Sequence, residues 1–583
     1  MTNTKEKHQT AIAADIAKKP KKAAPRKPLD KSRKDWWKQA VIYQIYPKSF
    51  QDSNGDGIGD LPGILSRLDY LEDLGVDALW LSPIFCSPQA DNGYDVSDYE
   101  DVDPMFGSMA DLETLIAEAK KRGISIILDL VLNHTSEKHP WFLEALKSKD
   151  SPYHDYYLFR DGTPENPPTD MKAIFGGSAW EYVPELGQYY YHQFAKEQPD
   201  LNWSNPKVRE ELYAMIRFWV NKGVDGFRLD AIDLIGKDVD LKTTSNGPNL
   251  HPYLQELSKN ALIKDGLVTV GEAWGASVED ARRYSKPDGS ELSMIFQFRQ
   301  NFADLKDGKW ERKELDLPAL KQVFEDFQCG LHGCGWNALF MDNHDLPRIV
   351  SRWGDPEHYW KESAKMLVIW LYGMEGTPFV YQGEEIGMTN VRFAIEDYRD
   401  IEILNHLRDG LDAGRSEEEL MEGIYNMGRD NARTPMQWSN AKNAGFSEAE
   451  PWIKLNPNCK TINAASQQND PDSIFHTYKE LIALRKSLPV LANGDFQLLD
   501  KAHPAVFAYT RKTDDQALLT LANFSKEPQT FDIPAAFAEA DCLISSYGKD
   551  SRPELLKGEN LEGLCTIRLR PYEGCMLLET KLI

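Results

Sequence analysis

Apolar segments rich in β-branched residues alternate with amphipathic segments through most of the chain, and this alternation restricts the fold more than any other feature. Residues 41–50, 76–83, 124–134, 224–230, 267–274, 336–342 and 377–381 are predicted strands. Helices are predicted between them at 63–74, 110–122, 207–222, 251–262, 317–327 and 360–372. Buried strands separated by helices form parallel sheets. About eight such units within about 450 residues predict an α/β fold of the (β/α)8 TIM barrel type.

Two stretches interrupt the alternation and suggest further domains. Residues 135–201 are rich in aromatic residues, Gly and Pro, and are predicted as a small domain inserted after the third strand. The barrel would then comprise residues 36–134 and 202–490, with a long excursion at about 391–470. Short alternating apolar runs predict a C-terminal all-β sandwich at 491–583. Residues 1–35 are rich in Lys, Arg, Ala and Pro, and are predicted as a disordered basic tail.

Charge and cysteine content restrict the partners and the compartment. The net charge of −24 argues against nucleic acid or an anionic membrane surface as a partner. No apolar run approaches the roughly 18 residues of a membrane span. The 7 Cys show no CxxC or zinc-like spacing, which indicates reduced thiols in a cytoplasmic protein. We expect a monomer.

Polar side chains stand where the predicted strands end. In a TIM barrel the carboxyl ends of all strands face one mouth, where the chemistry takes place. At such a mouth an aromatic ring can pack against a sugar ring, imidazole groups can donate hydrogen bonds to it, and acids can transfer protons. The candidates in chain order are Asp91, Tyr94, His134, Arg228, Asp230, Glu272, His344 and Asp345.

Two of these acids can hydrolyse a glycosidic bond. Arg228 lies two residues from Asp230 on the same strand face, so it should keep that carboxylate ionised as the nucleophile. Glu272 lies among like charges and beside Trp274, which should raise its pKa and suit a general acid. Asp345 remains to stabilise the transition state. A gap of about 5–5.5 Å between Asp230 and Glu272, and retention at the anomeric carbon, are expected.

Two other interpretations of these acids remain. The Arg228–Asp230 pair could be a purely structural ion pair. Metal-assisted hydrolysis is less favoured, because the acids lack the close spacing of metal ligands.

The loop QDSNGDGIGD, residues 51–60, is a candidate calcium site. Asp52, Asn54, Asp56 and Asp60 supply hard oxygen ligands at alternate positions, and the glycines permit a sharp turn. The bidentate Glu of a full EF-hand loop is missing. The alternative is a turn built by Asn and Asp side chains that caps the following helix.

The blocks DNGYD, DLVLNHT, GFRLD, GEAW and DNHD resemble, in this order, the motifs of the α-amylase family of glycoside hydrolases, from about residue 36 to the end. The resemblance implies Asp230 as nucleophile, Glu272 as acid and base, and Asp345 as transition-state stabiliser. It implies a structural Ca²⁺ bound by Asp52, Asn54, Asp56, Asp60 and the carbonyl of Ile58. Residues implied around the sugar are Asp91, Tyr94, His134, Phe175, Arg228, His344 and Arg429, with Lys309 and Glu402 at the second sugar.

Four further segments indicate the subfamily. QPDLNW resembles the marker of oligo-1,6-glucosidases, and SNGPNLHPYL, GRDNARTPMQW and YQGEEIGMTN resemble bacterial dextran glucosidases. The resemblance implies a retaining exo-α-glucosidase that releases glucose from short α-1,6-linked oligosaccharides. Trehalose-6-phosphate hydrolases are also similar, but a phosphate pocket is not located in the sequence. Transporter subunits that share the fold without catalysis are disfavoured, because this chain keeps all three acids.

Two departures leave the linkage open. Ala231 stands where 1,6-specific relatives usually carry Val, and the smaller side chain leaves room that favours α-1,4 links as well. The segment FMDNHD is similar to the corresponding segment of sucrose isomerases. This similarity leaves open an enzyme that acts on sucrose, by isomerisation or by hydrolysis. Those enzymes carry an Arg-rich RLDRD loop, whereas the comparable stretch FRQNFADLKDGKW has a single Arg, Arg299, which disfavours isomerisation.

Overall fold

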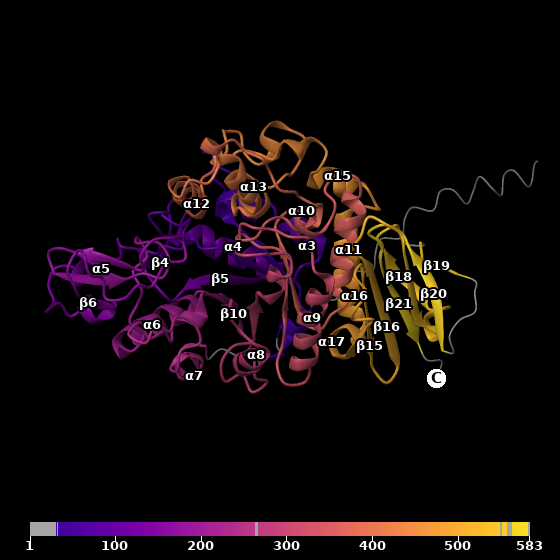
Figure 1. The fold of residues 1–583 in the computed structure, drawn as a ribbon, viewed down its shortest axis with the longest axis horizontal. Helices are drawn as coiled ribbons and strands as arrows, with labels where there is room; N and C mark the ends of the chain where they lie inside the picture. Colours follow the sequence, from indigo (N-terminus) through magenta and orange to yellow (C-terminus); the bar gives the residue numbers. More distant parts are fainter. Residues whose placement is uncertain are drawn as a thin grey trace, which may run out of the picture.

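Eight parallel strands form the centre of the computed structural model, which describes residues 29, 31, 33–262, 266–548, 551–556 and 563–580 (Figure 1). Their order is β11-β10-β9-β5-β2-β1-β13-β12, and a parallel bridge between Ile295 and Asn337 closes the sheet. The predicted TIM-barrel fold class is confirmed. The strands are β1 (Ile42–Ile45), β2 (Ala78–Leu81), β5 (Ser125–Val131), β9 (Gly226–Asp230), β10 (Val268–Ala273), β11 (Met294–Gln297), β12 (Ala338–Leu339) and β13 (Thr377–Tyr381).

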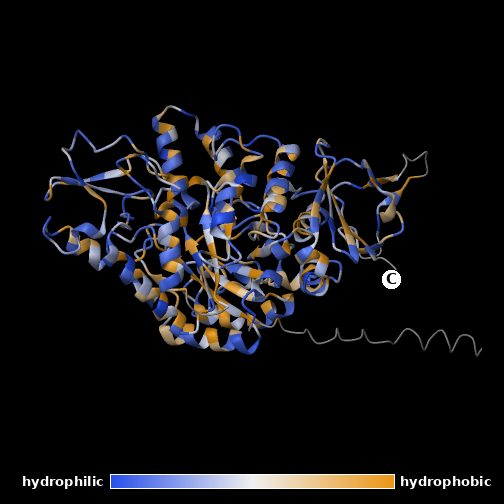
Figure 2. Ribbon diagram, turned by 90° about the horizontal axis from the view of Figure 1, so that it is seen from below, coloured by the Kyte–Doolittle hydropathy of each residue, from blue (hydrophilic) through white to orange (hydrophobic). Residues whose placement is uncertain are grey.

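The strand register brings the candidate acids to one rim. Val131 is paired with Asp230, and Ala273 is paired with Gln297, so neighbouring strands end at the same level. Hydrophobic residues gather on the strands and on the helix faces turned toward them, while hydrophilic residues cover the outside (Figure 2).

Helices surround the barrel, and their ends follow local sequence signals. Ser108 and Asp111 form a capping box at the start of α4. The predicted helix 63–74 is wrong in one respect, because Arg67 leaves helical geometry and divides it into two. Strand β11 and helix α8 were not predicted. They are four and seven residues long, and β11 follows a run of polar residues. The helices are α2 (Leu61–Ser66), α3 (Leu68–Leu74), α4 (Met109–Lys121), α6 (Pro206–Asn221), α7 (Leu250–Asn260), α8 (Val278–Tyr284), α9 (Leu317–Leu331), α10 (Ile349–Trp353) and α11 (Trp360–Tyr372).

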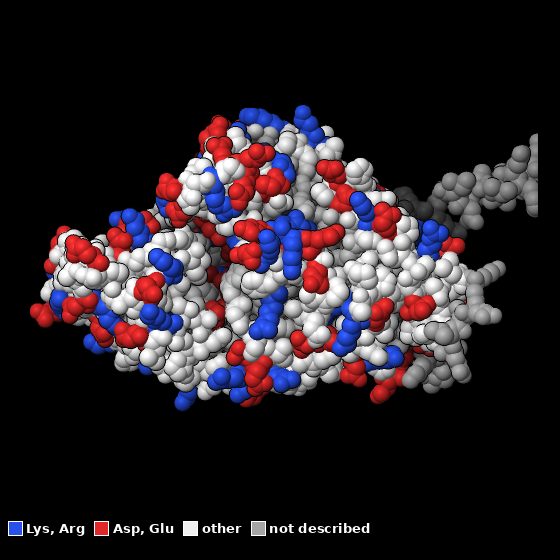
Figure 3. All heavy atoms as spheres, in the orientation of Figure 1, with Lys and Arg blue, Asp and Glu red and all other residues white. Residues whose placement is uncertain are grey.

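Two insertions extend from the barrel on the side where the strands end. Residues 135–201 contain α5 (Pro140–Ala145) and a three-stranded sheet of β6 (Phe159–Asp161), β7 (Trp180–Val183) and β8 (Gln188–Tyr191). The excursion contains α12 (Ile401–Asp412), α13 (Glu417–Met427) and α14 (Asp430–Arg433). Figure 3 shows a hollow between the inserted segment and the body of the molecule, with acidic side chains in it.

A C-terminal all-β region follows α16 (Ile474–Ser487) and α17 (Pro489–Asn493), and lies at the opposite end from the insertion (Figure 1). One sheet contains β14 (Asp495–Leu499), β15 (Val506–Lys512), β16 (Gln516–Asn523), β21 (Gly574–Thr580) and β18 (Asp541–Ser545). The other contains β17 (Gln529–Pro534), β20 (Leu564–Leu569) and β19 (Glu554–Leu555). Tyr509 joins this region to the barrel helix α11 by donating to the Trp370 carbonyl at 2.5 Å.

Two sequence predictions are not tested by the described residues. Most of the predicted basic tail lies outside the described residues, and the exact domain boundaries stay predictions. Within the described part of the chain, no helix is long and apolar enough to cross a membrane.

Candidate active site

One guanidinium holds three carboxyl groups at the ends of the central strands. Arg228 Nη1 donates to Asp230 Oδ1 at 2.6 Å and to Asp129 Oδ1 at 3.0 Å. Its Nη2 donates to Glu272 Oε2 at 2.5 Å. All four side chains are buried. The structure therefore brings Asp230 and Glu272 together on one planar group, as expected of two acids that flank one glycosidic bond.

The protonation of this cluster differs from the expectation. Burial raises the pKa of Asp230 well above its ordinary value, and although Arg228 acts in the opposite direction, Glu272 and Asp129 add to the increase. The prediction that Arg228 lowers the pKa of Asp230 below its ordinary value is therefore wrong. Because three acids share one cation, we infer that the cluster retains a proton near neutral pH. A nucleophile and a general acid need one proton between them.

Glu272 is oriented by three donors. Besides Arg228, the Ala231 amide donates to Oε2 at 3.1 Å, and Trp274 Nε1 donates to Oε1 at 2.9 Å. Ala231 has a φ of 41°, a left-handed conformation that is costly for a residue with a side chain and that points its N–H at Glu272. Trp274 stacks on Phe298 with 3.9 Å between ring centroids and is 41% exposed, so it offers an open face next to the acid.

Asp345 is held as a carboxylate on the other side of the site. It contacts His344 Nε2 at 3.1 Å, Arg433 Nη2 at 2.9 Å and Arg429 Nη1 at 3.3 Å. Burial would raise the pKa of Asp345, but these neighbours outweigh burial and hold the pKa well below its ordinary value. A permanent negative charge at this position suits stabilisation of a cationic transition state.

Asp91 lies beside the same arginine. It accepts from Arg429 Nη2 at 3.2 Å and from Gln198 Nε2 at 3.2 Å. Burial, opposed by Arg429 and Arg433, raises the pKa of Asp91 to about 7. Asp91 can therefore change its charge near neutral pH.

The two imidazoles have different surroundings. His344 stacks on Tyr94 with 5.3 Å between ring centroids, and Tyr94 Oη donates to Asp129 Oδ2 at 3.1 Å. His134 Nε2 donates to the Tyr94 carbonyl at 3.0 Å, and burial lowers the pKa of His134 to about 4. His134 is thus neutral, and this contact uses the hydrogen that was predicted to reach a sugar.

The inserted segment and α12 meet over Arg429. Asn405 Nδ2, from α12, donates to the Phe175 carbonyl at 3.1 Å, and the Arg429 guanidinium lies 4.9 Å from the centroid of the Phe175 ring. Lys309 and Glu402 form an ion pair, and Glu402 also contacts Arg429 Nε at 3.3 Å. These contacts hold Phe175, Asn405 and Arg429 together beside Asp91, and we call these three residues the wall of the site.

The loop at residues 51–60, predicted to bind calcium, folds as a series of side-chain turns. Asp52 Oδ1 accepts from the Asn54 and Gly55 amides at 3.0 and 2.7 Å, and Asp60 Oδ1 accepts from Gly63 at the start of α2 at 2.6 Å. These contacts match the alternative of a helix-capping turn. The oxygen donors are of the type that Ca²⁺ prefers. Within the described ranges no three His, Cys, Asp or Glu side chains are gathered for a metal, so calcium stays a prediction.

Comparison with known proteins agrees with this geometry. The model of the α-amylase catalytic domain matches residues 44–494. The chain belongs to the α-amylase family. A second model, the C-terminal domain of the α-amylase SusG, matches residues 506–574. The predicted family resemblance and its glycoside hydrolase class are confirmed.

Several members of the α-amylase family are similar along nearly the whole chain. An oligo-1,6-glucosidase from Parageobacillus thermoglucosidasius is 48% identical over 559 residues, covering 92% of this chain and 98% of the relative. A glucan 1,6-alpha-glucosidase from Streptococcus pneumoniae is 53% identical over 499 residues, covering 85% and 92%. The solved structure of trehalose-6-phosphate hydrolase from Bacillus licheniformis is 43% identical with a TM-score of 0.87, covering 94% of this chain and 100% of that structure.

Four residues of this family member's site were missed from the sequence. Asp129 lies within the predicted strand 124–134, on the strand face opposite the apolar residues 124, 126, 128, 130 and 132. A single acid inside an otherwise apolar strand is a signal that could have identified it. Arg433 lies four residues after Arg429, a spacing typical of one helix face. Asp400, which accepts from Arg429 Nε at 3.0 Å, and Gln198 follow no strand, so only the folded chain reveals them.

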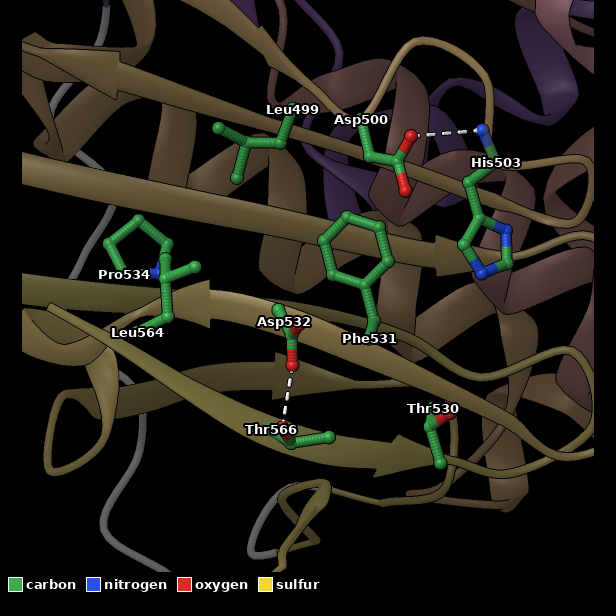
Figure 4. A pocket seen from close by; sticks show the side chains of 9 residues that line it. All are labelled: Leu499, Asp500, His503, Thr530, Phe531, Asp532, Pro534, Leu564 and Thr566. Atoms are coloured by element: carbon green, nitrogen blue, oxygen red, sulfur yellow. Dashed lines mark hydrogen bonds between the residues drawn. The ribbon is translucent and has the colours of Figure 1, made fainter. Parts of the chain in front are cut away.

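A cavity of about 380 Å³ in the C-terminal region is not part of this site. It lies between β14, β17 and β20, and its lining includes Asp500, His503, Phe531, Asp532 and Thr566 (Figure 4). Its polar groups already pair with one another, as Thr566 Oγ1 donates to Asp532 at 2.6 Å and the His503 amide donates to Asp500 at 3.2 Å.

Proposed function

We propose that the protein is a retaining exo-α-glucosidase that releases glucose from the non-reducing end of short α-1,6-linked oligosaccharides of the isomaltose type. The observation that carries this proposal is the Arg228 guanidinium, which holds Asp230 and Glu272 side by side at the barrel mouth. The similarity to oligo-1,6-glucosidase and glucan 1,6-alpha-glucosidase supports the substrate class.

The residues divide the reaction between them. Asp230 attacks the anomeric carbon while Glu272 gives its proton to the leaving glycosidic oxygen, so a covalent glucosyl ester forms on Asp230. Glu272 then takes a proton from water, and the resulting attack on the anomeric carbon frees Asp230. Two inversions give net retention. For this step the single proton of the Arg228 cluster must lie on Glu272 and Asp230 must be ionised, and the negative charge of Asp345 stabilises the positive charge of the transition state.

The wall of Phe175, Asn405 and Arg429 accounts for release of a single terminal sugar. The contact between Asn405 and the Phe175 carbonyl joins two insertions across the far end of the site. Asp91 and Arg429 present hydrogen-bonding groups toward that end, where the last hydroxyls of a chain would lie. A polymer running through the site would meet this wall.

Linkage preference is the finer part of the proposal. Ala231 leaves space next to the leaving oxygen, which favours some activity on α-1,4 links as well. The second candidate is action on sucrose, supported by FMDNHD at residues 340–345. The third is trehalose-6-phosphate hydrolysis, supported by similarity to a hydrolase of that name.

Glucose release from isomaltose, panose, maltose, sucrose and trehalose-6-phosphate, measured side by side, tests the proposal. The highest kcat/KM is expected on isomaltose or panose. Faster turnover of sucrose or trehalose-6-phosphate would reject the first candidate in favour of the second or third. Asp230→Asn should remove activity on every substrate while the far-ultraviolet circular dichroism stays unchanged.

A structural Ca²⁺, a cytoplasmic location and a monomeric state complete the proposal. Ca²⁺ would be bound by the oxygen donors of the loop, Asp52, Asn54, Asp56, Asp60 and the Ile58 carbonyl, and would stabilise that loop rather than take part in the reaction. All 7 cysteines are free in the described residues, which supports a reducing compartment.

A further inference from the structure

A second pair of buried acids lies beside the loop that carries Asp345. Asp342 precedes that loop, and Glu384 follows strand β13 on the neighbouring side of the barrel mouth. Both side chains are buried, and each carboxyl group is close enough to the other to shift its pKa. Two ionised carboxylates this close in a buried site would repel strongly.

Each of the two acids uses one carboxyl oxygen in a hydrogen bond to another residue, and its second oxygen is left without a donor. Asp342 Oδ2 accepts from the Ile349 amide at 3.0 Å, and Glu384 Oε1 accepts from Tyr478 Oη at 2.5 Å. Asp342 Oδ1 and Glu384 Oε2 are buried and have no other donor in the described part of the chain. A proton between these two oxygens would satisfy both.

The charges around the pair also require a single proton. Arg348 lies close enough to favour the ionised form of Asp342, but its guanidinium donates to main-chain carbonyls, including Gln382 at 2.6 Å, and to no carboxylate in the described residues. A pair with one proton carries one negative charge, which balances Arg348. The other titratable groups facing the pair are Glu385, which accepts from Tyr43 and Tyr70, and the phenols of Tyr372, Tyr381 and Tyr478.

We propose that Asp342 and Glu384 share one proton, and that this bond positions the loop bearing His344 and Asp345 for catalysis. Asp342 closes that loop through its contact with Ile349, and the Asp345 amide donates within it to Asn343 Oδ1 at 2.8 Å. Asp342 and Glu384 are therefore positioning residues, since they reach the sugar only through Asp345.

The direction of the pKa shifts supports the shared proton. Burial first, and the facing Asp342 second, raise the pKa of Glu384 well above its ordinary value, and burial raises the pKa of Asp342. A raised pKa in the folded protein gives stability that is complete at low pH and is lost as the pH rises through the raised value. Wild-type protein should therefore lose thermal stability, as the pH rises above the ordinary carboxyl pKa toward the raised one, more steeply than a variant without the shared proton.

Infrared difference spectra at neutral pH test the proposal directly. Wild type minus Glu384→Gln should show the carbonyl band of a protonated carboxylic acid, and the unfolding midpoint of the variant should fall less steeply with rising pH. Glu375→Gln is the matched control, because Glu375 is a buried acid paired with His332 at 2.7 Å. No acid band in the Glu384→Gln difference, or parallel stability curves, would overturn the shared proton.

Kinetics test the positioning role. Asp342→Asn can still donate an N–H to Glu384, so its kcat should stay near wild type. Asp342→Ala removes the link, and misplacement of Asp345 should lower kcat about ten- to hundredfold with little change in KM. Equal losses in the Asn and Ala variants, or unchanged kcat in both, would contradict it. The spectra and the stability curves do not depend on which sugar is cleaved, so their failure is distinguishable from failure of the proposed function.

Discussion

Replacement of Arg228 by Lys tests how the two catalytic acids are held. The guanidinium makes separate hydrogen bonds to Asp230 and Glu272, at 2.6 and 2.5 Å. A lysine ammonium keeps the charge but has no planar fork, so it can contact only one of the two acids well. A hydrogen bond to a charged group contributes about 1.5–3 kcal/mol. Loss of one such bond at the reacting centre should lower kcat/KM about ten- to hundredfold.

The assay for Arg228→Lys is glucose release from isomaltose, with kcat and KM determined separately. Most of the loss should appear in kcat, because the acids act on the reacting bond rather than on the distant hydroxyls. Arg209→Lys is the control, since Arg209 pairs with Glu256 at a partly exposed position away from the site. A folded Arg228→Lys enzyme with kcat/KM within about threefold of wild type would refute the argument that the guanidinium fork aligns the acids.

Three further predictions follow from other parts of the site. The pKa of Asp91 is about 7, and its ionised form accepts sugar hydroxyls more strongly, so wild-type kcat/KM should rise as the pH increases through about 7. The pH profile of Asp91→Asn should lack this rise. A variant profile identical to that of wild type would exclude Asp91 as the group that titrates. Asn405→Ala removes the contact with the Phe175 carbonyl and should raise KM for isomaltose while leaving kcat nearly unchanged; a selective loss of kcat would contradict the role of the wall. Chelation by EDTA should lower the thermal midpoint of wild type, with recovery on adding Ca²⁺, but should leave Asp56→Ala unaffected; an identical midpoint with and without EDTA would exclude calcium.

The sequence predicts those parts of the fold and site that are carried by regular strands. Helix 360–372 and strand 377–381 were predicted with the bounds that the structure has, because Gly373 and Gly376 mark the turn between the amphipathic helix and the apolar strand. The acids at the ends of β9 and β10 were found for the same reason. Strand β11 was missed because so few residues give no reliable period.

The protonation of the acids and the contacts made by the insertions could not be predicted from the strand pattern of the sequence. Arg228 next to Asp230 in the sequence predicted a lowered pKa, but the sequence does not show how many other acids share the same guanidinium. Burial in the folded barrel raises the pKa of Asp230, and Glu272 and Asp129, which reach the guanidinium only in the folded chain, add to the increase. Likewise, Asp400 comes from an excursion without strand periodicity and contacts Arg429 through tertiary structure alone.

The anomeric configuration of the first product tests the central claim most directly. Proton NMR of isomaltose hydrolysis, recorded before the released sugar equilibrates, distinguishes the two outcomes. If Asp230 and Glu272 act as a close pair around one sugar, α-glucose must appear first and the β form only later by mutarotation. Initial β-glucose would mean that a water molecule lies between the two carboxyl groups, and it would contradict the assignment of Asp230 as a nucleophile.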